Sequence, residues 1–215
     1  SGRRVPNVIS MDELKTRAKS HGAIPMNVPY FVCVSRFDRM KRIDTVIEAW
    51  SMLREGSDVS LVLVGDGVVR GELEAQVCLE KLDDRVFFLG ALANPIPVLA
   101  GAKALILASE YEGFSNSVLE AMCLDVPVIT SLCSSDAAEM CESGAALGFR
   151  VGDAEQLVAQ VSALLGSTGL AGELVASART SRAPHLLPAA IWEYERVIRE
   201  TANEVKGDGG DRCAA

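Results

Sequence analysis

Short apolar runs alternate with amphipathic stretches along most of this chain. The apolar runs are rich in β-branched and aromatic residues, which favours strands buried on both faces. They cover residues 30–35, 61–64, 86–89, 104–108 and 126–130, and a weaker sixth run covers residues 145–151. Between the runs, apolar residues recur at spacings of three and four, which is typical of helices with one buried face. The alternation predicts an α/β fold with a Rossmann-like, doubly wound, mainly parallel sheet of about six strands.

The same pattern divides the chain into three parts. Residues 1–27 lack strong periodicity apart from a short polar helix expected over residues 11–21, and we interpret them as a lead-in or linker. Residues 28–205 are expected to form the sheet domain and to end in two helices, over residues 170–180 and 187–205. Residues 206–215 are small and polar, so we expect a disordered tail.

Composition restricts the classes of function. The chain has 215 residues, of which 49% are hydrophobic and 23% charged, and its net charge is −8. These values are typical of a globular domain with a sizeable core, and the negative charge argues against a nucleic-acid partner. No run approaches the roughly 18 apolar residues of a membrane helix, and the start does not resemble a signal peptide. Six cysteines without a C-x-x-C pair favour free thiols in a reducing compartment, so a cytoplasmic location is expected.

Residues 112–120 are the most informative stretch for function. Ligands of doubly wound sheets bind beyond the carboxyl ends of the strands, and this stretch follows the fourth predicted strand. Glu112 lies in the loop, and Glu120 lies on the first turns of the next helix. Backbone N–H groups of residues 115–119 offer an anion site, and the carboxylates can accept bonds from hydroxyls. An alternative stays open, because residues 117–120 read S-x-x-E, a capping box in which Glu120 only completes its own helix start.

A basic loop follows the first predicted strand. Arg36 and Lys41 flank it, and two cations at the carboxyl end of a strand could neutralise a diphosphate. The alternative is an ordinary solvated loop, which is what most clusters of Lys and Arg form.

Three further features favour structural interpretations. Residues 64–67 are similar to a dinucleotide-binding turn, but Arg70 replaces the third glycine, so we interpret the glycines as turn-formers and an NAD or flavin module as disfavoured. Residues 134–136 are expected to cap the helix that carries Glu139. His21 and His185 lie outside the predicted βα core without a nucleophile or metal partner nearby in sequence, so both are interpreted as surface residues.

In combination and in order, these segments resemble glycosyltransferase family 4, the retaining nucleotide-sugar transferases with the two-domain GT-B fold. The resemblance rests on Arg36-x4-Lys41, residues 64–67, residues 88–90, Glu112-x7-Glu120 and residues 125–129. It covers about residues 3–200 and is specific to the C-terminal, donor-binding half of such enzymes. Residues 5–7 are similar to the family's linker from the N-terminal domain, and the last predicted helix is similar to the one that crosses back to it.

The resemblance implies a role for each matching residue. Arg36 and Lys41 would bind the donor diphosphate and stabilise the leaving group in place of a metal ion. Glu120 would bind the ribose, Glu112 would position the transferred sugar, and the backbone of residues 90–92 would contact the base. The catalytic residues would be Glu112, Arg36 and Lys41. The donor-binding set would be Arg36, Lys41, Gly90, Ala91, Leu92, Glu112, Gly113, Phe114, Ser115, Asn116, Leu119 and Glu120.

The resemblance also implies partners. A UDP- or GDP-sugar would donate a hexose, with retention, to a glycan or lipid-linked acceptor in surface polysaccharide biosynthesis. No metal or other cofactor is expected, because the nucleotide-sugar is a substrate. The acceptor would bind an N-terminal domain expected to lie outside this chain, and peripheral membrane association would come through that half. The isolated chain is therefore expected to be an incomplete enzyme. A stand-alone, non-catalytic nucleotide-sugar sensor remains the alternative.

Two departures from the family pattern concern loops near the predicted site. Ser134 and Ser135 stand where the family often has a glycine pair, and this difference affects what the loop after the fifth predicted strand can accommodate. Arg42 stands where glycine is common after the lysine, and we expect this change to affect only local backbone shape.

Overall fold

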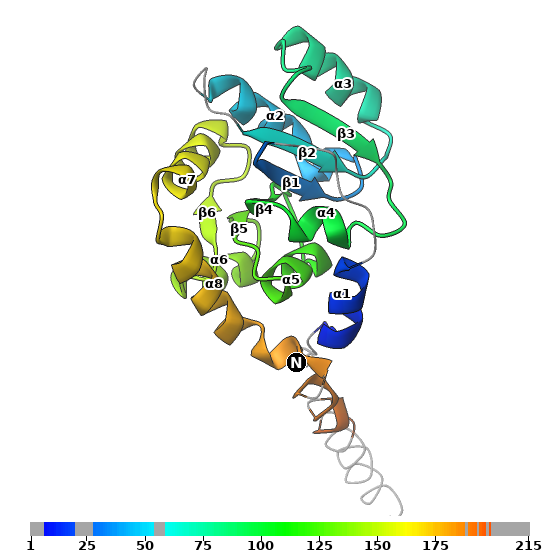
Figure 1. The fold of residues 1–215 in the computed structure, drawn as a ribbon, viewed down its shortest axis with the longest axis vertical. Coiled ribbons are helices and arrows are strands. Elements are labelled where there is room, and N and C mark those ends of the chain that lie inside the picture. Colours follow the sequence, from blue (N-terminus) through cyan, green and yellow to red (C-terminus); the bar gives the residue numbers. More distant parts are fainter. Residues whose placement is uncertain are drawn as a thin grey trace, which may run out of the picture.

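Six strands form one parallel sheet in the order β3-β2-β1-β4-β5-β6 (Figure 1). The computed structural model describes residues 7–19, 28–53, 59–187, 189–192, 194–196 and 198. The strands are β1 Tyr30–Val34, β2 Ser60–Val64, β3 Val86–Gly90, β4 Ala104–Leu107, β5 Val128–Ser131 and β6 Leu147–Phe149. Each predicted run overlaps a strand, and the weak sixth run forms one over three residues. The prediction of an α/β, Rossmann-like, doubly wound sheet is confirmed.

Helices cover both faces of the sheet, with α2, α3 and α7 on one face and α4, α5 and α6 on the other (Figure 1). Phe31 and Cys33 of β1 point into the first layer, whereas Tyr30 and Val32 point into the second. Burial on both faces is why the strands are continuous apolar runs. The helices are α1 Met11–Ala18, α2 Ile43–Met52, α3 Arg70–Leu79, α4 Ile96–Ala100, α5 Asn116–Cys123, α6 Ser135–Glu142, α7 Ala154–Gly166 and α8 Leu170–Ser181, with short 3₁₀ helices η1 Arg39–Lys41 and η2 Ala183–His185.

The strand order places a topological switch point between β1 and β4. From β1 the chain moves outward to β2 and β3, and it then returns to place β4 on the other side of β1. Crevices at such points bind ligands in doubly wound sheets. The β1–α2 loop and the β4–α5 loop border this crevice, and the N–H of Glu110 donates to the carbonyl of Met40 across it at 2.7 Å. The fold therefore brings the two predicted functional loops together.

The described part of the predicted lead-in packs on the sheet domain. Ser10 caps α1, and Leu14 is buried in a small cluster with Ile96 of α4 and with Leu119 and Cys123 of α5. Ile9 also forms an isolated parallel bridge with Leu186, so the segments before α1 and after α8 lie side by side. Residues 20–27, the end of the predicted last helix and the tail at 206–215 lie outside the described residues.

Within the described ranges, no single helix is long and apolar enough to cross a membrane. Helices α7 and α8 meet that test of length and composition only as a pair, which bends by 106° at a short break.

Candidate functional site

Lys41 and Glu112 form an ion pair across the switch point. Lys41 ends η1 in the β1–α2 loop, and its Nζ contacts Oε2 of Glu112 in the β4–α5 loop. The side chains are only 18% and 22% exposed. The hydroxyl of the fully buried Ser109 donates to the same carboxylate oxygen at 3.3 Å. Two of the sequence-predicted residues are thus brought together in a partly desolvated position, where charge interactions are stronger than in water.

Arg36, the other predicted cation, lies apart from this pair. Its side chain is 85% exposed, and within the described residues the nearest carboxylate to its guanidinium is that of Asp38, at 3.6 Å. An exposed ion pair of that length contributes little to stability. Arg36 therefore follows the carboxyl end of β1 with an exposed guanidinium that can change partners at low energetic cost.

The β1–α2 loop packs tightly against the loop after β2. Phe37 is fully buried, its N–H donates to the carbonyl of Asp66 at 2.8 Å, and its carbonyl accepts from Val69 at 3.2 Å. A Cβ on Gly65 would lie 1.8 Å from the carbonyl oxygen of Ser35, and one on Gly67 would lie 2.3 Å from that of Phe37. These glycines are required for the close approach of two loops, so they need no dinucleotide to explain them.

The start of α5 differs from the capping-box interpretation. The helix begins at Asn116 with Ser115 as its N-cap, so Glu120 lies at the fifth helical position and not at the third, where a capping-box glutamate lies. The hydroxyls of Ser115 and Ser117 contact each other at 2.9 Å, and neither caps the helix. The capping-box alternative for Glu120 is wrong. The first-turn N–H groups lack a side-chain cap, which leaves them suited to an anion.

Leu119 differs from its predicted place in the donor-binding set. Its N–H donates to the carbonyl of Ser115 at 3.1 Å, and its side chain is buried beside Leu14 and Ile96. Neither group is available to a ligand in this structure, and the contribution of Leu119 is to pack α5 against α1 and α4. The exposed Gly113 and Asn116, in contrast, remain accessible at the start of the helix.

Glu120 lies in a small cavity between α1 and α5, of about 230 Å³. Its side chain is 20% exposed, and Nη1 of Arg17 lies 3.8 Å from its Oε1. Burial raises the pKa of Glu120, and the charge of Arg17 partly opposes this rise. Sequence reasoning missed Arg17, because it lies on a helix of the predicted lead-in, far from residue 120 in sequence. Only the packing of α1 places it there.

The segment predicted to contact the base lies at the same edge of the sheet. Gly90 ends β3 in a left-handed conformation with φ +70°, and its carbonyl accepts from the N–H of Gly65 at 2.8 Å. Ala91 and Leu92 are exposed. Further along this loop, the amide of Asn94 donates to the carbonyl of Arg17 at 2.9 Å. Through Arg17, the loop after β3 is therefore connected to the cavity that contains Glu120.

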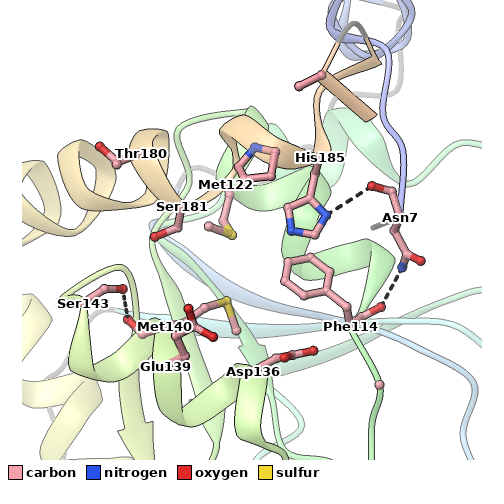
Figure 2. Close-up of a pocket in the computed structure, with 13 residues that line it drawn as sticks. Asn7, Phe114, Met122, Asp136, Glu139, Met140, Ser143, Thr180, Ser181 and His185 are labelled. Atoms are coloured by element: carbon pink, nitrogen blue, oxygen red, sulfur yellow. Dashed lines mark hydrogen bonds between the residues drawn. The ribbon is translucent and has the colours of Figure 1, made fainter. Parts of the chain in front are cut away.

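A larger cavity, of about 760 Å³, is lined in part by Gly113 and Phe114 of the β4–α5 loop (Figure 2). The ring of His185 stacks on Phe114 with centroids 4.2 Å apart, and its Nδ1 lies 3.1 Å from the carbonyl oxygen of Asn7. The amide of Asn7 donates to the carbonyl of Phe114 at 2.8 Å (Figure 2). His185 is thus half-buried against a predicted site residue, which corrects its interpretation as a surface residue. The pattern of the chain contains no signal for this contact.

Helix α6 forms another wall of that cavity. Ser134 caps α6 by accepting from the N–H of Ala137 at 3.2 Å, as predicted, and Asp136 and Glu139 of α6 line the cavity. Within the part of the chain that the structure describes, no three His, Cys, Asp or Glu side chains gather closely enough to hold a metal ion. That the protein needs no metal stays a prediction.

Comparison with known proteins identifies the family. Residues 28–167 match the family described as glycosyl transferases group 1, and this range contains both loops of the switch point. The chain belongs to this family. Among curated relatives of this group 1 glycosyltransferase, N-acetylgalactosamine-N,N'-diacetylbacillosaminyl-diphospho-undecaprenol 4-alpha-N-acetylgalactosaminyltransferase of Campylobacter jejuni is 29% identical over 62% of this chain and 36% of its own length. N-acetyl-alpha-D-glucosaminyl L-malate synthase of Bacillus anthracis is 33% identical over 53% of this chain and 30% of its own length.

Solved structures share the fold of this group 1 glycosyltransferase. HepE of Anabaena, solved in complex with UDP and glucose, matches 93% of this chain with a TM-score of 0.78 and 19% identity. Sucrose-phosphate synthase of Thermosynechococcus elongatus matches 94% with a TM-score of 0.81 and 24% identity. The chain spans about a third of the length of these curated relatives and 56% and 53% of the two solved chains.

Proposed function

We propose that this chain is the donor-binding part of a retaining GT-B glycosyltransferase of family 4. The complete enzyme transfers a hexose from a UDP- or GDP-sugar to a glycan or lipid-linked acceptor in surface polysaccharide biosynthesis. The observation that carries the proposal is the Lys41–Glu112 pair at the switch point of the sheet, in a chain that belongs to the group 1 glycosyltransferases. A cation and a hydroxyl acceptor lie together where a nucleotide-sugar would present its diphosphate and its sugar.

In the proposed mechanism, the donor separates this pair. Lys41 leaves Glu112 for the diphosphate, and the exposed Arg36, just after β1, adds a second cation. The two charges neutralise the diphosphate as it departs, which stabilises the transition state without a metal ion. Glu112, still held by the hydroxyl of Ser109, then accepts from a hydroxyl of the transferred sugar. The N–H groups at the start of α5 supply further donors to the anion.

The nucleoside is proposed to lie between α5 and the loop after β3. Glu120 accepts from the ribose hydroxyls, and the backbone of residues 90–92 contacts the base. The position of Arg17 supports this arrangement, because its guanidinium lies 3.8 Å from Glu120 on α5 and its carbonyl accepts from the amide of Asn94 in the loop after β3. The acceptor, the cytoplasmic location and any membrane association belong to the complete enzyme, of which this chain spans a part.

The proposal is tested by calorimetric titration with UDP-, GDP- and ADP-sugars and with NAD. We expect UDP- or GDP-sugar to bind, and we expect Lys41→Ala and Glu120→Ala each to cost about 1–3 kcal/mol of binding, as hydrogen bonds to charged groups do. Lys103→Ala and Glu155→Ala are matched controls, because both side chains are exposed and lie away from the proposed site. Lys103 precedes the amino end of β4, and Glu155 lies on α7. Binding of NAD without binding of any nucleotide-sugar would contradict the proposal.

A further inference from the structure

Arg42 occupies a backbone conformation that disfavours its own residue type. It links η1 to α2 with φ +46° and ψ +42°, in the left-handed region. A side chain with a Cβ is strained there, whereas glycine adopts the region freely. Such a conformation persists where the surrounding contacts stabilise it.

The side chain of Arg42 bridges two elements. Its Nε and Nη2 bind both carboxylate oxygens of Asp44 at 3.1 and 3.0 Å, which holds the guanidinium on the first turn of α2. Its Nη1 reaches Oε1 of Glu110, in the β4–α5 loop, at 3.1 Å. The Arg42 side chain is 28% exposed. A single solvated ion pair would contribute little to stability. The bidentate contact with Asp44, however, orients the guanidinium toward Glu110.

A backbone contact connects the same two loops beside this bridge. The N–H of Glu110 donates to the carbonyl of Met40 at 2.7 Å. Met40 and Arg42 flank Lys41, and Glu110 precedes Glu112 by two residues. Two connections thus hold the loops together next to the pair that the donor is proposed to separate. Neither connection uses Lys41 or Glu112, so neither is lost when that pair opens.

We propose that Arg42 is a positioning residue. It holds the β1–α2 and β4–α5 loops in place relative to each other while the Lys41–Glu112 pair opens and both side chains bind the donor. The inference rests on the proposed function, since it assigns the exchange to donor binding. Without the Arg42 bridge, opening of the Lys41–Glu112 pair would leave the backbone hydrogen bond between Met40 and Glu110 to hold the two loops together at this point. The loops would then drift apart, and the donor would have to order them again at the expense of affinity.

The experiment uses substitutions that separate backbone strain from the bridge. Arg42→Gly and Arg42→Asn remove the guanidinium, and both residue types tolerate left-handed backbone. We expect the affinity for UDP or GDP, whichever the wild-type chain binds, to fall roughly tenfold in both variants, by analogy with other losses of positioning. The unfolding temperature should shift by no more than about 4 °C, because lost contacts and relieved strain offset each other. Arg42→Lys retains a charge and should lose less affinity.

Glu110→Gln tests the partner of the bridge. It should reproduce the loss of affinity, and the double variant with Arg42→Gly should lose no more than either single variant, since both remove one interaction. Amide hydrogen exchange over residues 109–114 should become faster in Arg42→Gly without any ligand.

Three results would overturn the inference. They are wild-type nucleotide affinity in Arg42→Gly, additive losses in the double variant, and unchanged amide exchange over residues 109–114. Failure of the proposed function has a different appearance: the wild-type chain would bind neither UDP nor GDP, while exchange over residues 109–114 would still respond to Arg42→Gly. That result would mean that Arg42 stabilises the two loops but has no role in donor binding.

Discussion

Glu120 combines a partly buried carboxylate with a counter-charge beyond hydrogen-bond distance. Its side chain lies between α1 and α5, and Arg17 approaches it only to 3.8 Å. Burial raises the pKa of Glu120, so the folded protein binds this proton more tightly than the unfolded chain does. As the pH rises through the raised pKa, ionisation costs the folded state stability. A carboxylate in this position lowers the stability of the folded state, and a role in ligand binding would explain why it is there.

Glu120→Gln should therefore stabilise the protein at neutral pH and weaken nucleotide binding. The neutral amide avoids the desolvation of a carboxylate, so the unfolding temperature should exceed that of the wild type at pH 7. The difference should shrink as the pH falls through the raised pKa and vanish below about pH 4, where the glutamate is itself protonated. Thermal unfolding across this range measures the effect, with Glu155→Gln on α7 as the exposed control. Equal stability of variant and wild type at pH 7 would show that burial of Glu120 has no such cost.

The residues that sequence reasoning found and missed differ in how they reach the site. Lys41 and Glu112 directly follow strands, and parallel strands bring their carboxyl ends to one edge, so their proximity follows from the pattern. Arg17 and His185 arrive through the packing of α1 and of the segment after α8, more than 70 residues from their partners in sequence. Such contacts depend on how side chains pack, and no periodicity encodes them.

An aspartate just after α5 connects α8 to α5 through two arginines. Asp125 has a left-handed φ of +58°, and its carboxylate receives Arg179 at 2.7 Å and Arg182 at 3.1 Å, both from the end of α8. Arg182 also donates to the carbonyl of Met122. The hydrogen bond from Arg179 is the main reason why the pKa of Asp125 lies below its ordinary value. This network holds the segment that leads to His185 against the domain.

Asp125→Asn should weaken this attachment without straining the backbone, because asparagine tolerates the left-handed region. We expect a loss of about 1 kcal/mol in the free energy of unfolding at pH 7, which is the magnitude for a partly exposed network. A lowered pKa contributes stability that is present at neutral pH and lost as the pH falls through it. Variant and wild type should thus converge below about pH 3 in urea titrations. Asp84→Asn, in an exposed turn, is the control, and a loss that persists undiminished at low pH would rule out the ion pairs as its source.

The elements themselves follow closely from the sequence where one physical preference dominates. Buried strands are continuous apolar runs, and each one was predictable to within two or three residues at its ends. The start of α5 was not, because Ser115 and Ser117 both suit an N-cap and lie two residues apart. The amide of Asn7, which contacts Phe114 and Asn116, adds a tertiary influence at that helix start that the local pattern does not contain.

The strand order is a property of the whole chain that alternation alone leaves open. A parallel sheet of six strands follows from βαβ units, but the pattern does not state which strand lies beside β1. The observed order places β4 there and thereby creates the crevice. The bridge between Ile9 and Leu186, together with the contacts of Asn7 and His185, then brings the segments that enter and leave the domain beside the β4–α5 loop.

We therefore expect this 215-residue chain to bind a nucleotide-sugar but to transfer its sugar only slowly. A nucleotide-sugar at a hundredfold excess over its Kd should raise the free energy of unfolding by about 2.7 kcal/mol, because it binds only the folded state. Transfer to a saccharide acceptor should remain slow, since the proposed acceptor site belongs to a part of the enzyme beyond the donor-binding domain. Thermal unfolding and a donor-turnover assay on the same sample measure both. Rapid transfer by this chain alone would place acceptor-binding groups within it and contradict the proposed division. Slow transfer that accelerates when a partner domain is added would support it, whereas a non-catalytic sensor would bind equally well with and without the partner and transfer in neither case.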